Sequence, residues 1–242
     1  MLSHQFSIKL MEELFDIADH VKGMTRKPNG IEFLKSLLSH KKAMLYFTQP
    51  STRTFLSFLT ACQMVGMDTG EVRDPSLSSE YKGESQEDGV RVFSSYFDLI
   101  IMRDPKPGFC EYMAYLLDNT GRSVPIMNGG SGKDQHPTQA LLDLYTIHER
   151  LGRVEDIKVA IIGDILYSRV ARSNIWGLTK MGAQVVLCGP PTLLPSGLFK
   201  DPGMPEGHSF SSIETETTVE KAIEGAGHHE ASLLVDVYVY AV

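Results

Sequence analysis

The chain has 242 residues, of which 42% are hydrophobic and 22% charged, a composition typical of globular proteins. Its net charge of −7 disfavours general nucleic-acid binding, because neutralising phosphates requires clustered Lys and Arg. The same charge disfavours binding to an anionic membrane surface. We therefore expect neither a nucleic acid nor a membrane as a partner.

The cysteines and the first residues indicate a reducing compartment. Cys62, Cys110 and Cys188 lie far apart without CxxC spacing, which is typical of free thiols. Acidic side chains interrupt residues 1–23, so this segment does not resemble a signal peptide. No apolar run approaches the roughly 20 residues that span a bilayer. We expect a cytoplasmic protein.

Hydrophobic spacing predicts alternating helices and strands. Leu10, Leu14, Ile17 and Val21 predict an opening helix that stops at Gly23. Strands are predicted at 43–47, 99–102, 124–127, 158–162 and 184–187, and helices from about 52 to 64 and over 112–117, 137–151 and 168–181. This alternation predicts an α/β fold with mostly parallel strands and helices on both faces. A domain division is expected near Arg150, where a long helix ends at Gly152.

The segment Ser51-Thr52-Arg53-Thr54 follows a predicted strand and opens a helix. A helix N-terminus offers N–H donors and a positive dipole end, and the hydroxyls and the guanidinium add further donors. Together they predict an anion site, most naturally for phosphate. Helix capping by Ser or Thr is the alternative. Arg53 favours the anion, because a cation in the first turn opposes the dipole unless an anion compensates it.

Other polar residues also follow strands, where ligands bind in open α/β sheets. His136 opens a helix after a glycine-rich turn and shares one helix face with Gln139. Arg103 directly follows an apolar strand, and Tyr167 and Arg169 follow a later one. Each residue alone could equally have a structural role or be an exposed surface residue. Their common position at strand ends favours convergence on one site.

Several other motifs are missing or incomplete. A glycine follows one strand, but GxGxxG is absent, so dinucleotide binding is weakly supported. The segment 128–133, NGGSGK, lacks the first Gly of a P-loop and the Ser or Thr after its Lys. The histidines His208, His228 and His229 lack metal-ligand spacing. The polar stretch 74–85 has no periodicity and is predicted to be a surface loop.

Four segments together resemble the aspartate carbamoyltransferases. They are PSTRT at 50–54, KGES at 82–85, HPTQALLDLYTI at 136–147 and GDxxYxR at 163–169, in that order. PSTRT and HPTQ are general to carbamoyltransferases, whereas KGES and GDxxYxR resemble the aspartate branch rather than the ornithine branch. The resemblance covers roughly residues 10–191.

The resemblance implies a carbamoyltransferase of pyrimidine biosynthesis that needs neither a metal nor another cofactor. It implies two doubly wound domains, residues 1–149 for carbamoyl phosphate and 150–242 for L-aspartate, and a homotrimer with shared active sites. It assigns the phosphate to Ser51, Thr52, Arg53 and Thr54, the carbamoyl carbonyl to Thr54, Arg103 and His136, and the carbamoyl amide to Gln139. It places Ser78 and Lys82 in a neighbouring subunit's site, and Tyr167 and Arg169 on the aspartate side.

The sequence also departs from the family pattern. Gln49 replaces a common Glu, and Asp104 replaces a common His. The family's Arg-x-Gln segment and His-Pro-Leu-Pro loop have no match, so we expect the aspartate domain to be incomplete. Two alternatives follow: a truncated or degenerate homologue that binds carbamoyl phosphate or assembles with partners without turnover, and a carbamoyltransferase for another amine. The sequence does not predict whether a regulatory subunit binds.

Overall fold

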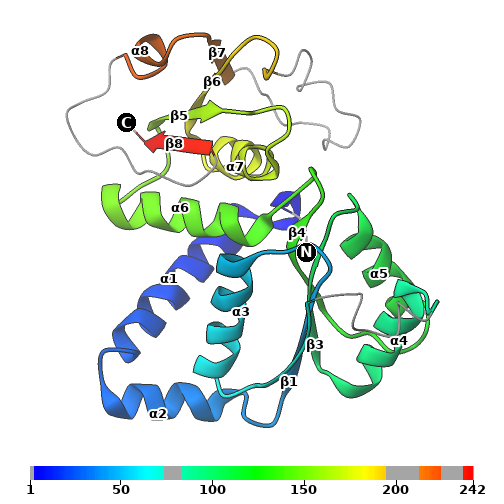
Figure 1. Ribbon diagram of the computed structural model, residues 1–242. Coiled ribbons are helices and arrows are strands. Elements are labelled where there is room, and N and C mark those ends of the chain that lie inside the picture. Colours follow the sequence, from blue (N-terminus) through cyan, green and yellow to red (C-terminus); the bar gives the residue numbers. More distant parts are fainter. Residues whose placement is uncertain (1–2, 74–82, 195–212, 225–236, 242) are drawn as a thin grey trace. The chain divides into compact units, whose positions relative to one another are not determined.

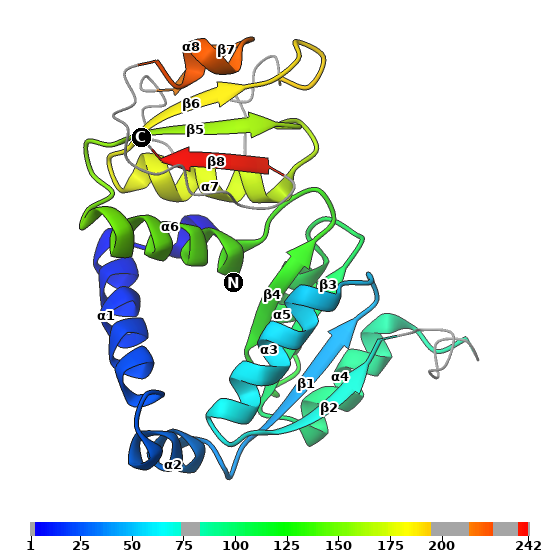
Figure 2. The same cartoon turned by 60° about the vertical axis from the view of Figure 1, so that its left-hand side comes forward.

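The computed structural model describes residues 3–73, 83–194, 213–224 and 237–241 (Figures 1 and 2). It divides into two compact units, one of residues 9–132 and one of residues 2–8 with 133–242. The helices are α1 (Ile8–Met24), α2 (Pro28–Leu37), α3 (Thr52–Met64), α4 (Gln86–Tyr96), α5 (Phe109–Asp118), α6 (Pro137–Leu151), α7 (Arg169–Lys180) and α8 (Val219–Ala222). The strands are β1 (Lys42–Phe47), β2 (Asp68–Val72), β3 (Leu99–Asp104), β4 (Ile126–Ser131), β5 (Lys158–Gly163), β6 (Gln184–Cys188), β7 (Ile213–Glu216) and β8 (Val237–Ala241).

The first unit is built on a parallel sheet with the strand order β2-β1-β3-β4. The chain runs outward from β1 to β2 and then returns to the other side of β1 through β3 and β4. The direction of winding therefore changes between β1 and β3. In doubly wound sheets the ligand crevice lies at this switch point, beyond the carboxyl ends of the strands.

Strand β1 is buried on both faces, which explains its nearly continuous apolar sequence. Met44 and Tyr46 belong to the core cluster that contains α4 and α5 side chains. Leu45 and Phe47 pack with α3. Figure 1 accordingly shows α3 on one side of this sheet and α4 and α5 on the other. The predicted helices on both faces are confirmed.

The second unit holds a second four-stranded sheet, with the order β7-β6-β5-β8. Strands β5, β6 and β7 are parallel, and β8 pairs antiparallel with β5. Helices α6 and α7 pack together, and Ala222 of α8 packs against Ala160, Val186 and Cys188 on one face of the sheet. The expectation of two mostly parallel α/β domains is confirmed.

Hydrogen bonds attach the first residues of the chain to helix α7 of this unit. The 3-10 helix Ser3–Gln5 belongs here, and Lys180 Nζ donates to the carbonyl oxygens of His4 (3.0 Å) and Phe6 (2.7 Å). Helix α6 ends at Gly152, whose φ of +74° suits the left-handed conformation that glycine adopts easily. The predicted stop at Gly152 is therefore confirmed.

The sequence predictions missed some elements. The first helix continues through Gly23 to Met24, and α2, β2, α4, β7 and α8 were not predicted. The chain passes from the first compact unit to the second between residues 132 and 133. The predicted boundary at 149/150 separates a domain that binds carbamoyl phosphate from one that binds L-aspartate, and it stays a prediction. Cys62, Cys110 and Cys188 are all buried free thiols.

Candidate active site

The carboxyl ends of β1 and β3 are joined by backbone hydrogen bonds. The N–H groups of Thr48 and Gln49 both donate to the carbonyl oxygen of Arg103, at 3.0 and 3.3 Å. The segment that leads into Ser51 is therefore attached to the strand end that carries Arg103. This attachment lies at the switch point of the sheet, where a ligand is expected.

Helix α3 begins without a side-chain cap. Ser51 occupies the N-cap position with extended backbone (φ −163°, ψ 117°), but its side chain makes no capping hydrogen bond, and the first turn contains no acidic residue. Ser85 and Ser168 show what capping looks like in this chain, since each accepts a 3.1 Å hydrogen bond from the third residue after it. Capping by the Ser51 side chain, the alternative interpretation, is therefore wrong.

Arg103 is brought to the start of α3. Its Nη1 donates to Thr54 Oγ1 and to the carbonyl oxygen of Gly129, both at 3.4 Å. Arg103 is half-buried and Arg53, in the same first turn as Thr54, is exposed. The first unit thus brings the Arg103 guanidinium to the Thr54 hydroxyl at an uncapped helix start whose first turn also carries Thr52 and Arg53, which is a chemically suitable place for a phosphate.

In the second unit, helix α6 also begins without a side-chain cap. His136 is buried at the N-cap position of α6 and makes no side-chain capping bond. Its N–H donates to Ser173 Oγ (2.9 Å), and its Nδ1 lies 3.4 Å from Thr138 Oγ1. The imidazole is therefore attached to a backbone that α7 holds in place.

Gln139 is also held by neighbouring side chains. Its Nε2 donates to Asp143 Oδ1 (2.7 Å), and Asn174 Nδ2 donates to Asp143 Oδ2 (2.6 Å). Burial raises the pKa of Asp143 to about 6, although both hydrogen bonds lower it in part. The roles of Asp143, Ser173 and Asn174 were not predicted from the sequence. The four-residue spacing from Gln139 to Asp143, one helical turn, is the signal that could have found the first of them.

Tyr167 and Arg169 lie at the entry to α7. The Tyr167 N–H donates to Asp164 Oδ1 (3.0 Å), and Lys133 Nζ lies 4.0 Å from the centroid of the exposed Tyr167 ring. Burial lowers the pKa of the Arg169 guanidinium. Arg169, which was predicted, and Lys133, which was not, therefore place two cations at this segment. Both suit the binding of a dicarboxylate.

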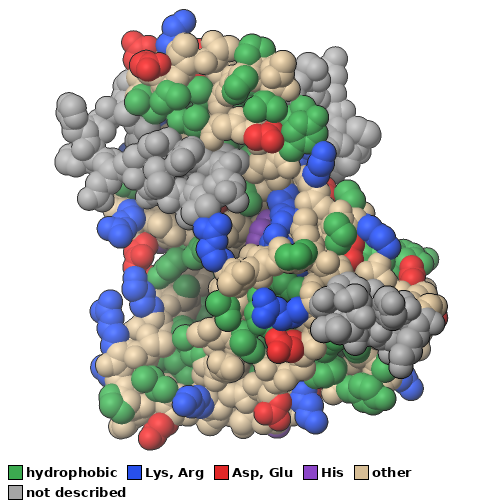
Figure 3. All heavy atoms as spheres, viewed as in Figure 1, with side chains coloured by type: hydrophobic (Ala, Val, Ile, Leu, Met, Phe, Trp, Pro, Cys, Tyr) green, Lys and Arg blue, Asp and Glu red, His purple; other side chains and the backbone are tan. Residues whose placement is uncertain are grey.

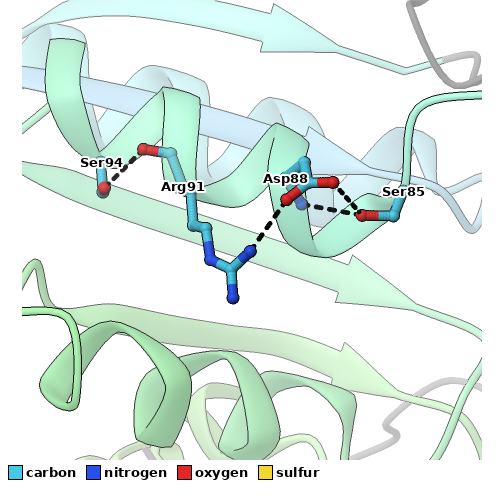
Figure 4. Close-up of polar contacts among 4 residues, drawn as sticks. All are labelled: Ser85, Asp88, Arg91 and Ser94. Carbon is cyan, nitrogen blue, oxygen red and sulfur yellow. Dashed lines mark hydrogen bonds and ion pairs between the residues drawn. The ribbon is translucent and has the colours of Figure 1, made fainter.

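Ser78 and Lys82 lie outside the described residues. The described end of KGES is ordered by helix capping, as Figure 4 shows: Ser85 Oγ accepts from the Asp88 N–H and bonds Asp88 Oδ2, and Arg91 Nη1 lies 2.8 Å from Asp88 Oδ1. A cavity of about 700 Å³ at the amino ends of the strands is lined by Lys41, Asp98 and Pro125 among others, and by none of the predicted site residues.

Within the residues that the structure describes, no three His, Cys, Asp or Glu side chains gather as ligands for a metal ion. None of the described helices has the length and apolarity needed to cross a membrane. On the face seen in Figure 3, basic side chains are scattered among acidic, apolar and uncharged groups.

Comparison with known proteins identifies the family. Residues 2–149 match the family model of the aspartate/ornithine carbamoyltransferase carbamoyl-P binding domain. The chain belongs to this family. The aspartate carbamoyltransferase catalytic subunit of Desulforudis audaxviator is 46% identical over 162 residues, which are 66% of this chain and 51% of that protein. The corresponding subunit of Natranaerobius thermophilus is 43% identical over 194 residues, or 80% of this chain and 59% of that one.

Solved structures agree with this assignment. An aspartate transcarbamoylase from Trypanosoma cruzi, in complex with N-(phosphonacetyl)-L-aspartic acid, matches with a TM-score of 0.79 and 30% identity, covering 92% of this chain and 70% of that one. The catalytic subunit of M. jannaschii aspartate transcarbamoylase matches with a TM-score of 0.70 and 34% identity. The carbamoyltransferase resemblance is therefore confirmed, and this chain spans about half the length of the first curated relatives.

Proposed function

We propose that this carbamoyltransferase-family chain transfers the carbamoyl group of carbamoyl phosphate to the α-amino group of L-aspartate. The observation that carries the proposal is Arg103 Nη1 beside Thr54 at the uncapped start of α3. Two related structures contain the substrates or products of this reaction: one T. cruzi enzyme holds carbamoyl aspartate and phosphate, and another holds carbamoyl phosphate and aspartate. The product would be N-carbamoyl-L-aspartate, which serves pyrimidine biosynthesis.

The proposed chemistry needs positioned donors and no covalent intermediate. The aspartate nitrogen attacks the carbonyl carbon, the new N–C bond forms, and the C–O bond to phosphate breaks with its electron pair leaving on phosphate. Negative charge grows on the carbonyl oxygen before phosphate departs. Arg103 and Thr54 would stabilise that oxygen, and the family resemblance assigns the same role to His136. Holding two substrates in reactive geometry supplies much of the remaining acceleration.

Roles for the other residues follow the same proposal. Ser51, Thr52 and Arg53 would bind the phosphate, and Gln139 the carbamoyl amide, with Asp143 fixing the Gln139 amide. Tyr167 and Arg169 would bind the aspartate carboxylates, with Lys133 nearby as a further cation. Comparing L-aspartate with L-ornithine as the acceptor tests this side. A preference for ornithine would contradict it.

The proposal is tested at Arg53. Arg53→Ala should weaken carbamoyl-phosphate binding roughly tenfold to a hundredfold, because a hydrogen bond to a charged group contributes about 1.5–3 kcal/mol. Calorimetric titration of the full chain measures this. Lys41→Ala is the matched control, because Lys41 pairs with Asp98 at the other end of the strands. Equal affinities of the wild-type chain and a folded Arg53→Ala variant would contradict the phosphate site.

We also propose a homotrimer in which Ser78 and Lys82 serve a neighbouring subunit's site. The support is the family resemblance. If sites are shared, mixing a Lys82→Ala chain with an Arg53→Ala chain should restore activity, because some sites then contain neither substitution. Sedimentation would confirm that mixed trimers form. Mixed trimers that stay as inactive as either parent would show that each site is self-contained.

A further inference from the structure

Asp104 is a buried carboxylate at the end of β3, directly after Arg103. Its side chain accepts three hydrogen bonds: Oδ2 from Thr48 Oγ1 (2.5 Å) and Gln86 Nε2 (3.1 Å), and Oδ1 from the Lys106 N–H (2.8 Å). Only 1% of the residue is exposed. Burying a charge is costly unless it is well hydrogen-bonded, and here three separate segments supply the donors.

The network extends to the elements around the crevice. Gln86, the first residue of α4, accepts from Lys106 Nζ (2.7 Å) and lies 3.2 Å from the Tyr46 hydroxyl of β1. Thr48 is the first residue after β1. Asp104 therefore ties together the carboxyl end of β1, the segment after β3 and the start of α4, from the face of the sheet opposite to α3.

Thr48 connects this network to Arg103. Its hydroxyl also lies 3.3 Å from the Arg103 carbonyl oxygen, to which its N–H donates at 3.0 Å. The Arg103 backbone is thus held by Thr48, while Thr48 is held by Asp104. The Arg103 guanidinium reaches Thr54 at only the outer limit of a hydrogen bond, 3.4 Å. A small displacement of the strand end would therefore change its position relative to the anion site.

We propose that Asp104 is a positioning residue that holds Arg103 in place for carbamoyl phosphate. This inference rests on the proposed function. It assigns a role to a residue that departs from the common family pattern, in which His follows the Arg. A neutral imidazole has one acceptor nitrogen and cannot accept three hydrogen bonds. Asp104, Thr48 and Gln86 therefore form a bracing arrangement that a histidine at position 104 could not complete.

Asp104→Asn tests the proposal, because an amide keeps the size of the side chain but has one acceptor oxygen instead of two. At least one of the three donors then loses its partner. We expect carbamoyl phosphate, titrated calorimetrically into the full chain at 25 °C, to bind about tenfold more weakly. Asp88→Asn is the matched control, because Asp88 is an exposed carboxylate in the first turn of α4 (Figure 4). Its affinity should equal that of the wild-type chain.

A double variant distinguishes positioning from general destabilisation. If Asp104 acts through Arg103, then adding Asp104→Asn to Arg103→Ala should cause no further loss of affinity. Additive losses would overturn the proposal, and so would wild-type affinity in Asp104→Asn while Arg103→Ala binds weakly. Wild-type affinity in Arg103→Ala itself would instead refute the proposed function. Should Asp104→Asn not fold, Gln86→Met removes one donor and keeps the carboxylate, and the same non-additivity with Arg103→Ala is expected.

Discussion

We predict that replacing Asp143 by Asn will remove a pH dependence from the stability of the second unit. Asp143 is 1% exposed, in the contact between α6 and α7. Burial raises its pKa from 3.8 to about 6, against the opposing effect of two hydrogen bonds from Asn174 and Gln139. The folded protein therefore binds a proton between about pH 4 and pH 6 that the unfolded chain has already released.

The sign and size of the effect follow from this difference. Because the folded state holds more protons in that window, the free energy of unfolding falls as the pH rises through it. A shift of about two pKa units corresponds to about 3 kcal/mol, at 1.36 kcal/mol per unit. The contribution of Asp143 is complete below about pH 4 and is lost above about pH 6.

Other groups titrate nearby with the opposite sign. Burial lowers the pKa of His4, so its contribution grows as the pH rises toward 6.5. Hydrogen bonds lower the pKa values of Asp88 and Asp98, whose contributions are lost only as the pH falls below about 4. The informative quantity is consequently the difference between wild type and Asp143→Asn at each pH, in which these contributions cancel.

The assay is urea unfolding followed by the fluorescence of Trp176, the only tryptophan of the chain, at several pH values from 4 to 7.5. Trp176 lies in α7, two residues from Asn174. Asn at position 143 loses one acceptor oxygen, which lowers stability by an amount that does not vary with pH. The free energy of unfolding of the wild type minus that of Asp143→Asn should therefore fall by about 2–3 kcal/mol from pH 4 to pH 7. A difference that stays constant over this range would refute the raised pKa of Asp143.

Two further predictions concern catalysis and the first unit. If the chain turns over, His136→Ala should lower kcat by about 10²–10³ while KM for carbamoyl phosphate changes little, because the lost donor acts where charge develops; steady-state kinetics measure this, and a pure rise in KM would contradict the role. Gly66→Ala should destabilise the first unit far more than Gly121→Ala in thermal unfolding. Both glycines have positive φ, but a Cβ at Gly66 would lie 1.8 Å from the Lys35 carbonyl oxygen and one at Gly121 meets nothing within 4 Å; equal losses would mean that backbone strain alone matters.

The fold could be predicted where burial is strong. Strand β1 is covered on both faces, so its continuous apolar run predicts a buried strand. Helix α6 carries buried side chains at helical spacing, which predicts a helix. Strand β2, DTGEV, is only partly buried and therefore has no apolar run. Helix α4 follows a polar segment, and although its Ser85 cap and acidic first turn are visible in the sequence, it carries few apolar residues. The pattern of burial, rather than chain position, decided which elements could be found.

The candidate site could be predicted in part for a similar reason. Residues such as Arg103 could be found because polar side chains stand out where a buried strand ends. Ser173 and Asn174 could not, since they are polar residues in the middle of a helix and would ordinarily face water. The contact between α6 and α7 buries both of them around His136 and Asp143. Only the packing of the two helices shows that they support the predicted residues.

The starts of α3 and α6 differ from those of the other helices that follow a strand. Among the helices that follow a strand in the described part of the chain, α4 and α7 are capped by Ser85 and Ser168, and α5 and α8 carry Glu111 and Glu220 in their first turns. Helices α3 and α6 have neither a side-chain cap nor an acidic residue there. A helix start without such a partner keeps its positive dipole end available to an anion. These two helices are also the ones that begin with PSTRT and HPTQ, so the two uncapped helix starts coincide with the motifs to which the proposed function assigns the phosphate and the carbamoyl group.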